Sequence, residues 1–343
     1  MAKIATIIGA GSWGTALGLE LARQDYRVGL WVYEPDLAAA MASGRENTRY
    51  LPGFRLPEGV QPTPELRDAL TPSGLAPERQ GGAALVILAV PSQALRAVLT
   101  RLRPLLPPAA ELVLATKGLE ENSLLRVSEV AADVLGAAIA PRLATLSGPT
   151  FAREVAAGDP AAVVLAAEAP ALAHSLQQRL SSARLRLYTS SDVTGVELAA
   201  SLKNVIAIAS GICHGLGLGS NTRAALVARG LAEMTRLAVA AGGLPETLAG
   251  LAGLGDLVLT CTGELSRNRA LGIALGQGAT LSEALAATPM VAEGVPTTAA
   301  AARLAAHWGV EMPIVEQMRR VLFERLPPRQ ALAELMQRAL KAE

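Results

Sequence analysis

The sequence predicts an α/β, doubly wound sheet that is followed by an all-helical domain. The chain has 343 residues, which is more than one compact core usually holds and which suits two domains. Up to about residue 190, short β-rich runs alternate with helical stretches, whereas the remainder shows helical patterns only. We therefore expect a first domain at residues 1–190 and a second at residues 191–343.

Seven apolar runs are the expected strands. Several are apolar on both faces, which is typical of a parallel sheet that helices cover on both sides. Strand, helix and strand in repetition indicate right-handed crossovers and a doubly wound sheet. The Pro- and Gly-rich segment 71–82 is expected to be a surface connection. The runs are KIATIIG (3–9), VGLWVYE (28–34), ALVILAV (84–90), ELVLATKG (111–118), LATLSGP (143–149), AAVVLAA (161–167) and LRLYTS (185–190).

Composition and charge exclude several classes of protein. A net charge of +1 gives no electrostatic basis for binding nucleic acid or an anionic membrane. Cys213 and Cys261 are too few for a disulfide framework or a Cys-rich metal site, which favours a reducing compartment. The chain enters KIATIIGAG almost at once, so we expect no signal peptide. The apolar run 204–222 is interrupted by glycines and His214, so we expect no membrane span and a cytoplasmic protein.

No metal site is expected either. The three histidines are far apart in sequence and lack the spacing of metal ligands. They are His174, His214 and His307.

A glycine-rich turn predicts a dinucleotide site. Gly9, Gly11 and Gly14 form G-x-G-x-x-G between an expected strand and an expected helix. Such glycines let the backbone approach a pyrophosphate, which rests on the helix N-terminus. Glu34 follows the second strand, 20 residues after Gly14, where an acid binds the adenine-ribose 2′-hydroxyl. Glu34 would repel a 2′-phosphate, so the sequence favours NADH over NADPH. Arg45 is the nearest downstream base, and a loop could return it to this point.

A lysine in an apolar segment is the strongest catalytic candidate. Only four of the 31 Lys and Arg are lysines, at positions 3, 117, 203 and 341. Lys203 lies in SLKNVIAIASG, where a helix would place Ala199, Ala200 and Ile206 beside it. Arg cannot release a proton near neutral pH, whereas a buried lysine can act as a general acid/base. The alternative is a lysine that snorkels at the edge of a core helix.

Two further segments carry candidate polar residues, each with a structural alternative. Asp256, in GLAGLGDLVLTCTG, is the candidate anionic partner of Lys203 or else a helix N-cap. Ser266, Arg267 and Asn268 open another expected helix. They could form an anion site suited to a phosphate. Ser266 could equally be an N-cap, and Arg267 a solvated surface charge.

Eight motifs in order resemble one family. GAGSWGTA, AVPS, ATKGLE, SGPTFARE, ELAASLKNVIAIASGI, GLGDLVLTCTG, SRNR and VAEGV, from about residue 4 to residue 300, are similar to the bacterial NAD(P)-dependent glycerol-3-phosphate dehydrogenases. The resemblance implies a Rossmann-like N-terminal domain, a helical C-terminal domain and a homodimer. It also implies reversible hydride transfer between NAD(P)H and dihydroxyacetone phosphate, giving sn-glycerol 3-phosphate for phospholipid synthesis.

The resemblance also implies roles for particular residues. Lys203 is the expected acid/base, held by Asp256, while Asn204 and Thr260 orient the lysine or the substrate. Lys117 lies where substrate and cofactor meet, and Arg267 contacts both. The other expected substrate contacts are Gly148, Thr150, Asp256, Ser266 and Asn268. The other expected cofactor contacts are Ser12, Trp13, Ala152, Val291 and Glu293.

Two alternatives remain open at this point. One is a two-domain dehydrogenase that acts on 3-hydroxy acids, whose carboxylate would make less use of the SRNR helix start. The other is a non-catalytic NAD-binding protein, which has no need of a titratable amine in an apolar helix.

Overall fold

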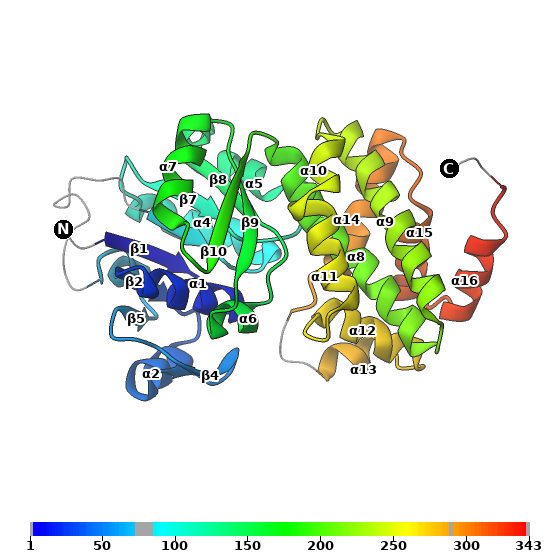
Figure 1. The fold of residues 1–343 in the computed structure, drawn as a ribbon, viewed down its shortest axis with the longest axis horizontal. Coiled ribbons are helices and arrows are strands. Elements are labelled where there is room, and N and C mark those ends of the chain that lie inside the picture. The colour runs from blue at the N-terminus through cyan, green and yellow to red at the C-terminus, as the bar shows by residue number, and fades with distance from the viewer. Residues whose placement is uncertain (1–2, 73–84, 288–290, 341–343) are drawn as a thin grey trace. The chain divides into compact units, whose positions relative to one another are not determined.

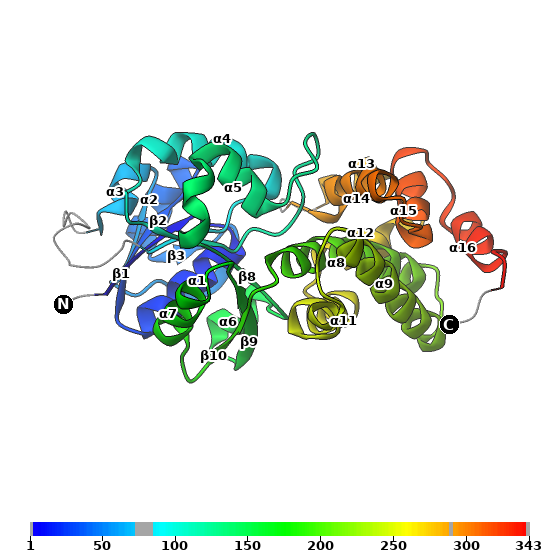
Figure 2. The same ribbon diagram turned by 90° about the horizontal axis from the view of Figure 1, so that it is seen from above.

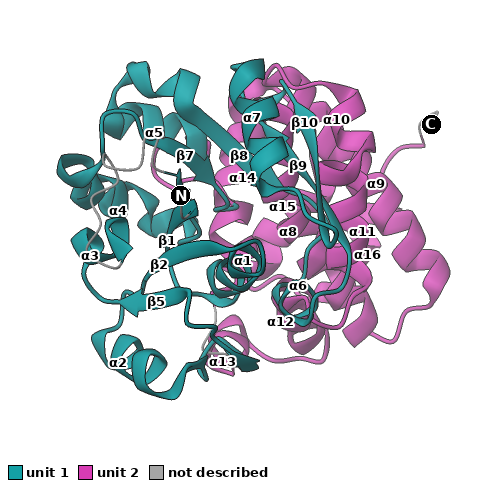
Figure 3. Cartoon of the chain, turned by 60° about the vertical axis from the view of Figure 1, so that its left-hand side comes forward, with its two compact units in different colours: residues 1–117, 127–193 teal, residues 118–126, 194–343 magenta. Residues whose placement is uncertain are grey.

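The computed structural model describes residues 3–72, 85–287 and 291–340, and the chain forms two compact units (Figure 3). One unit is made of residues 1–117 and 127–193, and the other of residues 118–126 and 194–343. Nothing in the sequence pattern indicates that the short segment 118–126 belongs with the helices. Most of the expected surface connection at 71–82 lies outside the described residues.

The first unit is built around an eight-stranded sheet with the order β10-β9-β8-β7-β6-β1-β2-β5. All seven strands expected from the sequence are present. The eighth, β5 (Val60–Thr63), is polar and contains Pro62, so it lacks an apolar pattern. As the edge strand beside β2 it tolerates a proline. The seven expected strands are β1 (Lys3–Ile8), β2 (Tyr26–Trp31), β6 (Leu85–Leu88), β7 (Glu111–Leu114), β8 (Leu143–Ser147), β9 (Ala161–Ala166) and β10 (Leu185–Ser190).

The last two strands depart from the expected parallel arrangement. β9 is antiparallel to β8, and β10 is parallel to β9. The connection from β8 to β9 holds only the six-residue α6 (Ala152–Ala157), which packs against α1 (Ser12–Arg23). It is too short to cover the sheet as a full crossover helix, so β9 returns in the opposite direction.

Helices cover both faces of the sheet, as its strands require. Figure 2 shows α4 and α5 on one face and α1 and α7 on the other. A two-stranded ribbon, β3 (Glu46–Asn47) with β4 (Leu51–Arg55), is separate from the main sheet. The remaining elements of the unit are α2 (Pro35–Gly44), α3 (Leu66–Leu70), η3 (Ser92–Ala94), α4 (Leu95–Leu102), η4 (Arg103–Leu105), α5 (Val127–Leu135), η5 (Ala137–Arg142) and α7 (Pro170–Leu180).

The second unit is helical, and its described residues contain no strand. Figure 1 shows its helices, among them the long α9, which packs on α8: a Cβ on Gly230 of α9 would lie 2.6 Å from the side chain of Ile206 of α8. Apolar residues of α8, α9, α11, α14 and α15 form its core. The elements are α8 (Val193–Gly215), α9 (Ser220–Ala240), α10 (Pro245–Ala249), the π-helical η6 (Leu251–Gly255), α11 (Asp256–Thr262), α12 (Arg267–Gly276), α13 (Leu281–Ala286), α14 (Gly294–Trp308), α15 (Pro313–Phe323) and α16 (Pro328–Met336).

Helix α8 is long and apolar enough to cross a membrane, but the window that meets this test is fully buried in the protein. A buried core helix passes the same test of length and composition. Among the described helices α8 alone does so, and its burial accounts for its apolar sequence.

Glycines let α8 and α12 touch through their backbones. A Cβ on Gly211 of α8 would lie 2.1 Å from the carbonyl oxygen of Arg269, and a Cβ on Gly272 of α12 would lie 2.0 Å from that of Ile208. Gly215 and Gly276, one turn further along each helix, make similar contacts. Both helices therefore carry G-x-x-x-G at their contact, the spacing that permits close approach of two helices.

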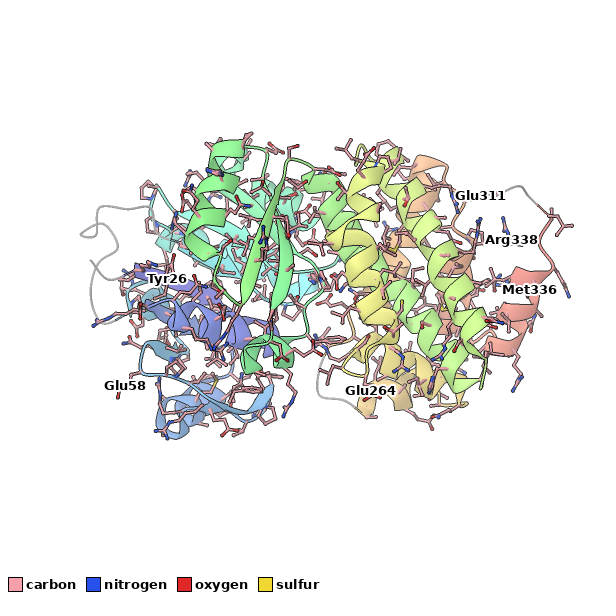
Figure 4. The ribbon with its side chains drawn as sticks, viewed as in Figure 1. Tyr26, Glu58, Glu264, Glu311, Met336 and Arg338 are labelled. Carbon is pink, nitrogen blue, oxygen red and sulfur yellow. The ribbon has the colours of Figure 1, made fainter. Side chains whose placement is uncertain are left out.

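A salt bridge fastens the chain just after α16. Arg338 lies 3.3 Å from Glu311 (Figure 4), and Arg320 of α15 pairs with Glu334 of α16. Both pairs are solvent-accessible, so each contributes little free energy. Their main effect is on the orientation of α16, and their effect on its stability is small.

Glu233 predicts a pH dependence of stability. Its carboxylate accepts hydrogen bonds from the backbone N–H groups of Ile314 and Val315 at the start of α15. Burial raises the pKa of Glu233 from 4.5 to about 7, although these hydrogen bonds oppose the change. The folded state therefore binds a proton that the unfolded state releases between these two pKa values, and stability decreases as pH rises through that window.

Glu233→Gln tests this linkage, because glutamine does not titrate. From pH 5 to pH 8, the wild-type protein should lose up to ~3 kcal/mol of unfolding free energy relative to the variant. Urea unfolding of both proteins at the two pH values measures the difference. An equal change in both proteins would show that Glu233 is not the titrating group.

Candidate active site

The glycine-rich turn follows β1 where the strand order reverses. β1 lies between β2 and β6, and the chain leaves it in both directions, which is where doubly wound sheets bind ligands. Gly9 has φ +111°, and a Cβ on Gly14 would lie 1.9 Å from the carbonyl oxygen of Gly9. Both positions therefore require glycine.

The start of α1 has room and an available donor for a dinucleotide. A Cβ on Gly11, the N-cap of α1, would meet nothing within 4 Å. The indole Nε1 of Trp13 is buried and has no hydrogen-bond partner. Ser12 donates to the carbonyl oxygen of Tyr50 at 2.6 Å. Open space at a helix N-terminus and a donor without an acceptor fit the phosphates of a dinucleotide.

Glu34 lies after β2 at the same sheet edge and has partners that the sequence did not indicate. Tyr50 donates its hydroxyl to Glu34 at 2.6 Å, and this hydrogen bond raises the pKa of Tyr50. Arg49 lies 3.9 Å from Glu34 and 2.8 Å from Asp36. Arg45 instead donates to backbone carbonyls, including that of Val60. The base beside Glu34 is thus Arg49.

Asn47 is a third residue that sequence reasoning missed. It is fully buried, and its amide donates to the carbonyl oxygen of Ala10 and to the hydroxyl of Thr15, both at 2.8 Å. It therefore braces the glycine-rich turn from the β3–β4 ribbon. An asparagine in the polar run RENTRY carries no sequence signal of burial.

Three predicted residues meet beside the ends of β7 and β8. Lys117 donates to the carbonyl oxygen of Gly148 at 3.3 Å, and the hydroxyl of Thr150 donates to the same oxygen at 3.2 Å. Ala152 begins α6 just beyond them. Because β1, β2, β6, β7 and β8 are parallel, these residues share one sheet edge with the glycine-rich turn.

Lys203 is buried in the helical unit and paired with an acid. Its Nζ lies 2.5 Å from the carboxylate of Asp256 and donates to the hydroxyl of Thr260 at 3.0 Å. The Thr260 hydroxyl in turn donates to the backbone carbonyl of Asp256 at 2.6 Å. Lys203 is 5% exposed and Asp256 1%, so each charge depends on the other. The anionic partner suggested for Lys203 is present.

The surroundings of Asp256 exclude the capping alternative. The π-helical η6 runs directly into α11, so Asp256 lies inside a continuous helical segment and caps no helix. Burial raises the pKa of the neighbouring Cys261 to about 12, which keeps the thiol uncharged. Cys213 and Cys261 are both buried and free.

Asn204 joins α8 to the start of α12 and α14. Asn268 donates to the side-chain oxygen of Asn204 at 3.0 Å, and the backbone N–H of Gly294 donates to the side-chain oxygen of Asn268 at 3.0 Å. Ser266 is the N-cap of α12 and accepts from the backbone N–H of Arg269, so its capping alternative holds.

The remaining predicted residues of the helical unit lie near the starts of α12 and α14. Part of the Arg267 side chain is exposed, but protein atoms around its guanidinium group desolvate it and lower its pKa, with the charge of Glu293 opposing the change. Val291 is exposed. No group of three His, Cys, Asp or Glu that could hold a metal occurs in the described ranges.

The fold and these side chains are those of a dinucleotide-dependent oxidoreductase: a glycine-rich turn at a sheet edge, and a buried lysine paired with a carboxylate. A family model described as NAD-dependent glycerol-3-phosphate dehydrogenase N-terminus matches residues 3–173, and one described as the C-terminus of the same enzyme matches residues 192–333. The chain belongs to the NAD-dependent glycerol-3-phosphate dehydrogenase family.

Individual relatives agree with this assignment. Glycerol-3-phosphate dehydrogenase [NAD(P)+] of Geobacter sp. (strain M21) is 52% identical over 343 residues, which covers 100% of this chain and 99% of that protein. Its counterpart in Koribacter versatilis (strain Ellin345) is 49% identical, with the same coverage. The crystal structure of glycerol-3-phosphate dehydrogenase from Coxiella burnetii is 44% identical, covers 98% of this chain and 99% of that chain, and has a TM-score of 0.89.

Proposed function

We propose that the chain reversibly transfers hydride between NAD(P)H and dihydroxyacetone phosphate, giving sn-glycerol 3-phosphate. The observation that carries the proposal is the buried pair of Lys203 and Asp256, in a family whose relatives bear this activity in their names. A buried ammonium that is oriented by a carboxylate and a hydroxyl suits proton transfer to a substrate oxygen.

The first unit would hold the dinucleotide, which supplies or accepts the hydride. Gly9, Gly11 and Gly14 would admit the pyrophosphate to the N-terminus of α1. The unpartnered indole N–H of Trp13 would donate to it. Glu34 would accept hydrogen bonds from the adenine ribose, with Tyr50 and Arg49 fixing its carboxylate.

Lys203 would donate a proton to the carbonyl oxygen as negative charge develops there during reduction, and would take it back during oxidation. Asp256 keeps the ammonium oriented and compensates its charge. The hydroxyl of Thr260 accepts from Nζ and helps to fix the direction of the ammonium group. The substrate phosphate would bind Arg267 and Asn268 at the start of α12, where helix dipole and guanidinium act together.

The direct test is nicotinamide absorbance at 340 nm, with purified protein, dihydroxyacetone phosphate, and NADH or NADPH in parallel. Oxidation of the cofactor only when the phosphorylated ketone is present supports the proposal. Turnover of 3-hydroxy acids in place of dihydroxyacetone phosphate would indicate a 3-hydroxy-acid dehydrogenase. Nucleotide binding without any redox activity would indicate a non-catalytic NAD-binding protein.

The neighbours of Glu34 predict which cofactor is preferred. The 2′-phosphate of NADPH would be repelled by the Glu34 carboxylate. Arg49 already pairs with Asp36, so it compensates this repulsion only in part, and NADH should give the higher kcat/KM. Glu34→Ser should shift the NADH-to-NADPH ratio of kcat/KM toward NADPH at least ~10-fold, on the scale of one close like-charge contact. Initial rates with both cofactors measure it. A wild-type preference for NADPH would contradict the assignment of Glu34.

The family also guides three further proposals. The product would enter glycerophospholipid synthesis, the protein would work in the cytoplasm, and the active form would be a homodimer. Sedimentation velocity of the purified protein tests the last of these.

A further inference from the structure

Three basic side chains meet at the end of α8, away from Lys203. Arg223 of α9 and Arg269 of α12 both approach Nδ1 of His214, at 3.3 and 3.4 Å. Arg223 also donates to the hydroxyl of Ser220 at 3.2 Å. His214 lies 11 residues after Lys203 on the same helix, which corresponds to ~16 Å along its axis.

Arg223 and Arg269 carry more N–H donors than the neighbouring groups can accept. Nδ1 offers one lone pair, so it can accept a hydrogen bond from only one of the two guanidinium groups that approach it. Arg269 is 9% exposed, and its Nε is buried with no hydrogen-bond partner. A buried guanidinium without a counter-charge is costly, so these unused donors indicate a missing acceptor.

The surrounding segments supply no negative charge. No Asp or Glu occurs from Leu198 to Ala232 or from Leu265 to Ser282, and within the described ranges neither Arg223 nor Arg269 forms an ion pair with a carboxylate. Burial raises the pKa of the adjacent Cys213 thiol, which keeps it uncharged. The first turn of the 21-residue α9, which begins at Ser220, has no acidic residue, and its free N–H groups favour an anion.

We propose that His214, Ser220, Arg223 and Arg269 form a second anion site, which binds a small soluble phosphate or phosphate monoester. Two guanidinium groups and a helix N-terminus match the charge and the several acceptor oxygens of a phosphate dianion. The site is separate from the proposed substrate site. Arg267 and Arg269 are two residues apart on α12, which places their side chains about 200° apart around the helix.

Binding of inorganic phosphate to the full-length protein tests the site without any need for turnover, so its outcome is independent of the proposed enzymatic function. The measurement is the increase in Tm with phosphate at constant ionic strength, with chloride as the reference salt. It is made in an Arg267→Gln background, where the proposed substrate phosphate site is lost. Phosphate should still raise the Tm of this variant.

Adding Arg223→Gln should weaken the apparent phosphate affinity at least ~10-fold, because it removes a charge-assisted contact. Arg229→Gln, on the exposed surface of the same helix, removes the same charge and should leave the affinity unchanged. Arg269→Lys keeps the charge but loses the fork, and should also weaken binding. No phosphate-dependent Tm shift in the Arg267→Gln background, or equal losses with Arg223→Gln and Arg229→Gln, would overturn the proposal.

Discussion

Lys203→Met is expected to lower kcat at least ~10²-fold, on the scale of general acid/base catalysis. Methionine keeps much of the volume of lysine but cannot donate a proton to the developing alkoxide. Affinity for NADH should change little, because the residues proposed to bind the nucleotide belong largely to the sheet unit. Steady-state rates with dihydroxyacetone phosphate, and nucleotide binding followed by fluorescence, measure the two quantities separately.

The single variant leaves Asp256 charged and buried, which costs about 3–5 kcal/mol of stability. Lys203→Met/Asp256→Asn removes both charges, and is the variant in which folding and chemistry can be separated. Its Tm should lie above that of Lys203→Met while kcat remains as low. Near-normal turnover in either folded variant would remove Lys203 from the mechanism.

Gly272→Ala is expected to destabilise the helical unit by about 3 kcal/mol, at the upper end of the usual cost of overpacking. The new methyl group would lie 2.0 Å from the carbonyl oxygen of Ile208, and a backbone atom cannot move aside as a flexible side chain can. The helices α8 and α12 would have to separate. Since Asn204 and Asn268 bridge these helices, KM for dihydroxyacetone phosphate should rise as well.

Thermal unfolding followed by circular dichroism at 222 nm measures the loss. Gly219→Ala is the matched control, because a Cβ there meets nothing within 4 Å and φ is −73°. Its cost should be about 1 kcal/mol or less, the usual difference at an N-cap. Equal losses in the two variants would refute the close-contact argument.

Much of the fold could be predicted because its signals are local. Apolar runs mark the buried strands, and the glycine-rich turn marks the sheet edge. The edge strand β5 was not predicted, since VQPT has neither an alternation of apolar and polar residues nor an apolar run. The antiparallel direction of β9 relative to β8 was not predicted either. It depends on how far α6 extends over the sheet, which is a tertiary property.

The residues of the candidate site also fall into those with a local sequence signal and those without one. Lys203 stood out because this chain otherwise uses arginine, and Asp256 because a buried ammonium needs an acid. Asn47, Arg49 and Tyr50 did not stand out. Their positions depend on the β3–β4 ribbon, which returns the chain to the glycine-rich turn, and a polar surface-like run contains no sign of that return.

The assignment of residues 118–126 to the helical unit limits how this protein can be cut. The polypeptide passes from one unit to the other after residues 117, 126 and 193. Leu119 belongs to the helical core, and Arg126 lies 2.9 Å from Glu197, which is 2% exposed. A fragment beginning at Thr194 would lack both Leu119 and Arg126. The two units therefore cannot be exchanged between proteins by joining the chains at a single point. Chimeras between relatives should therefore transfer the nine-residue excursion together with the helices.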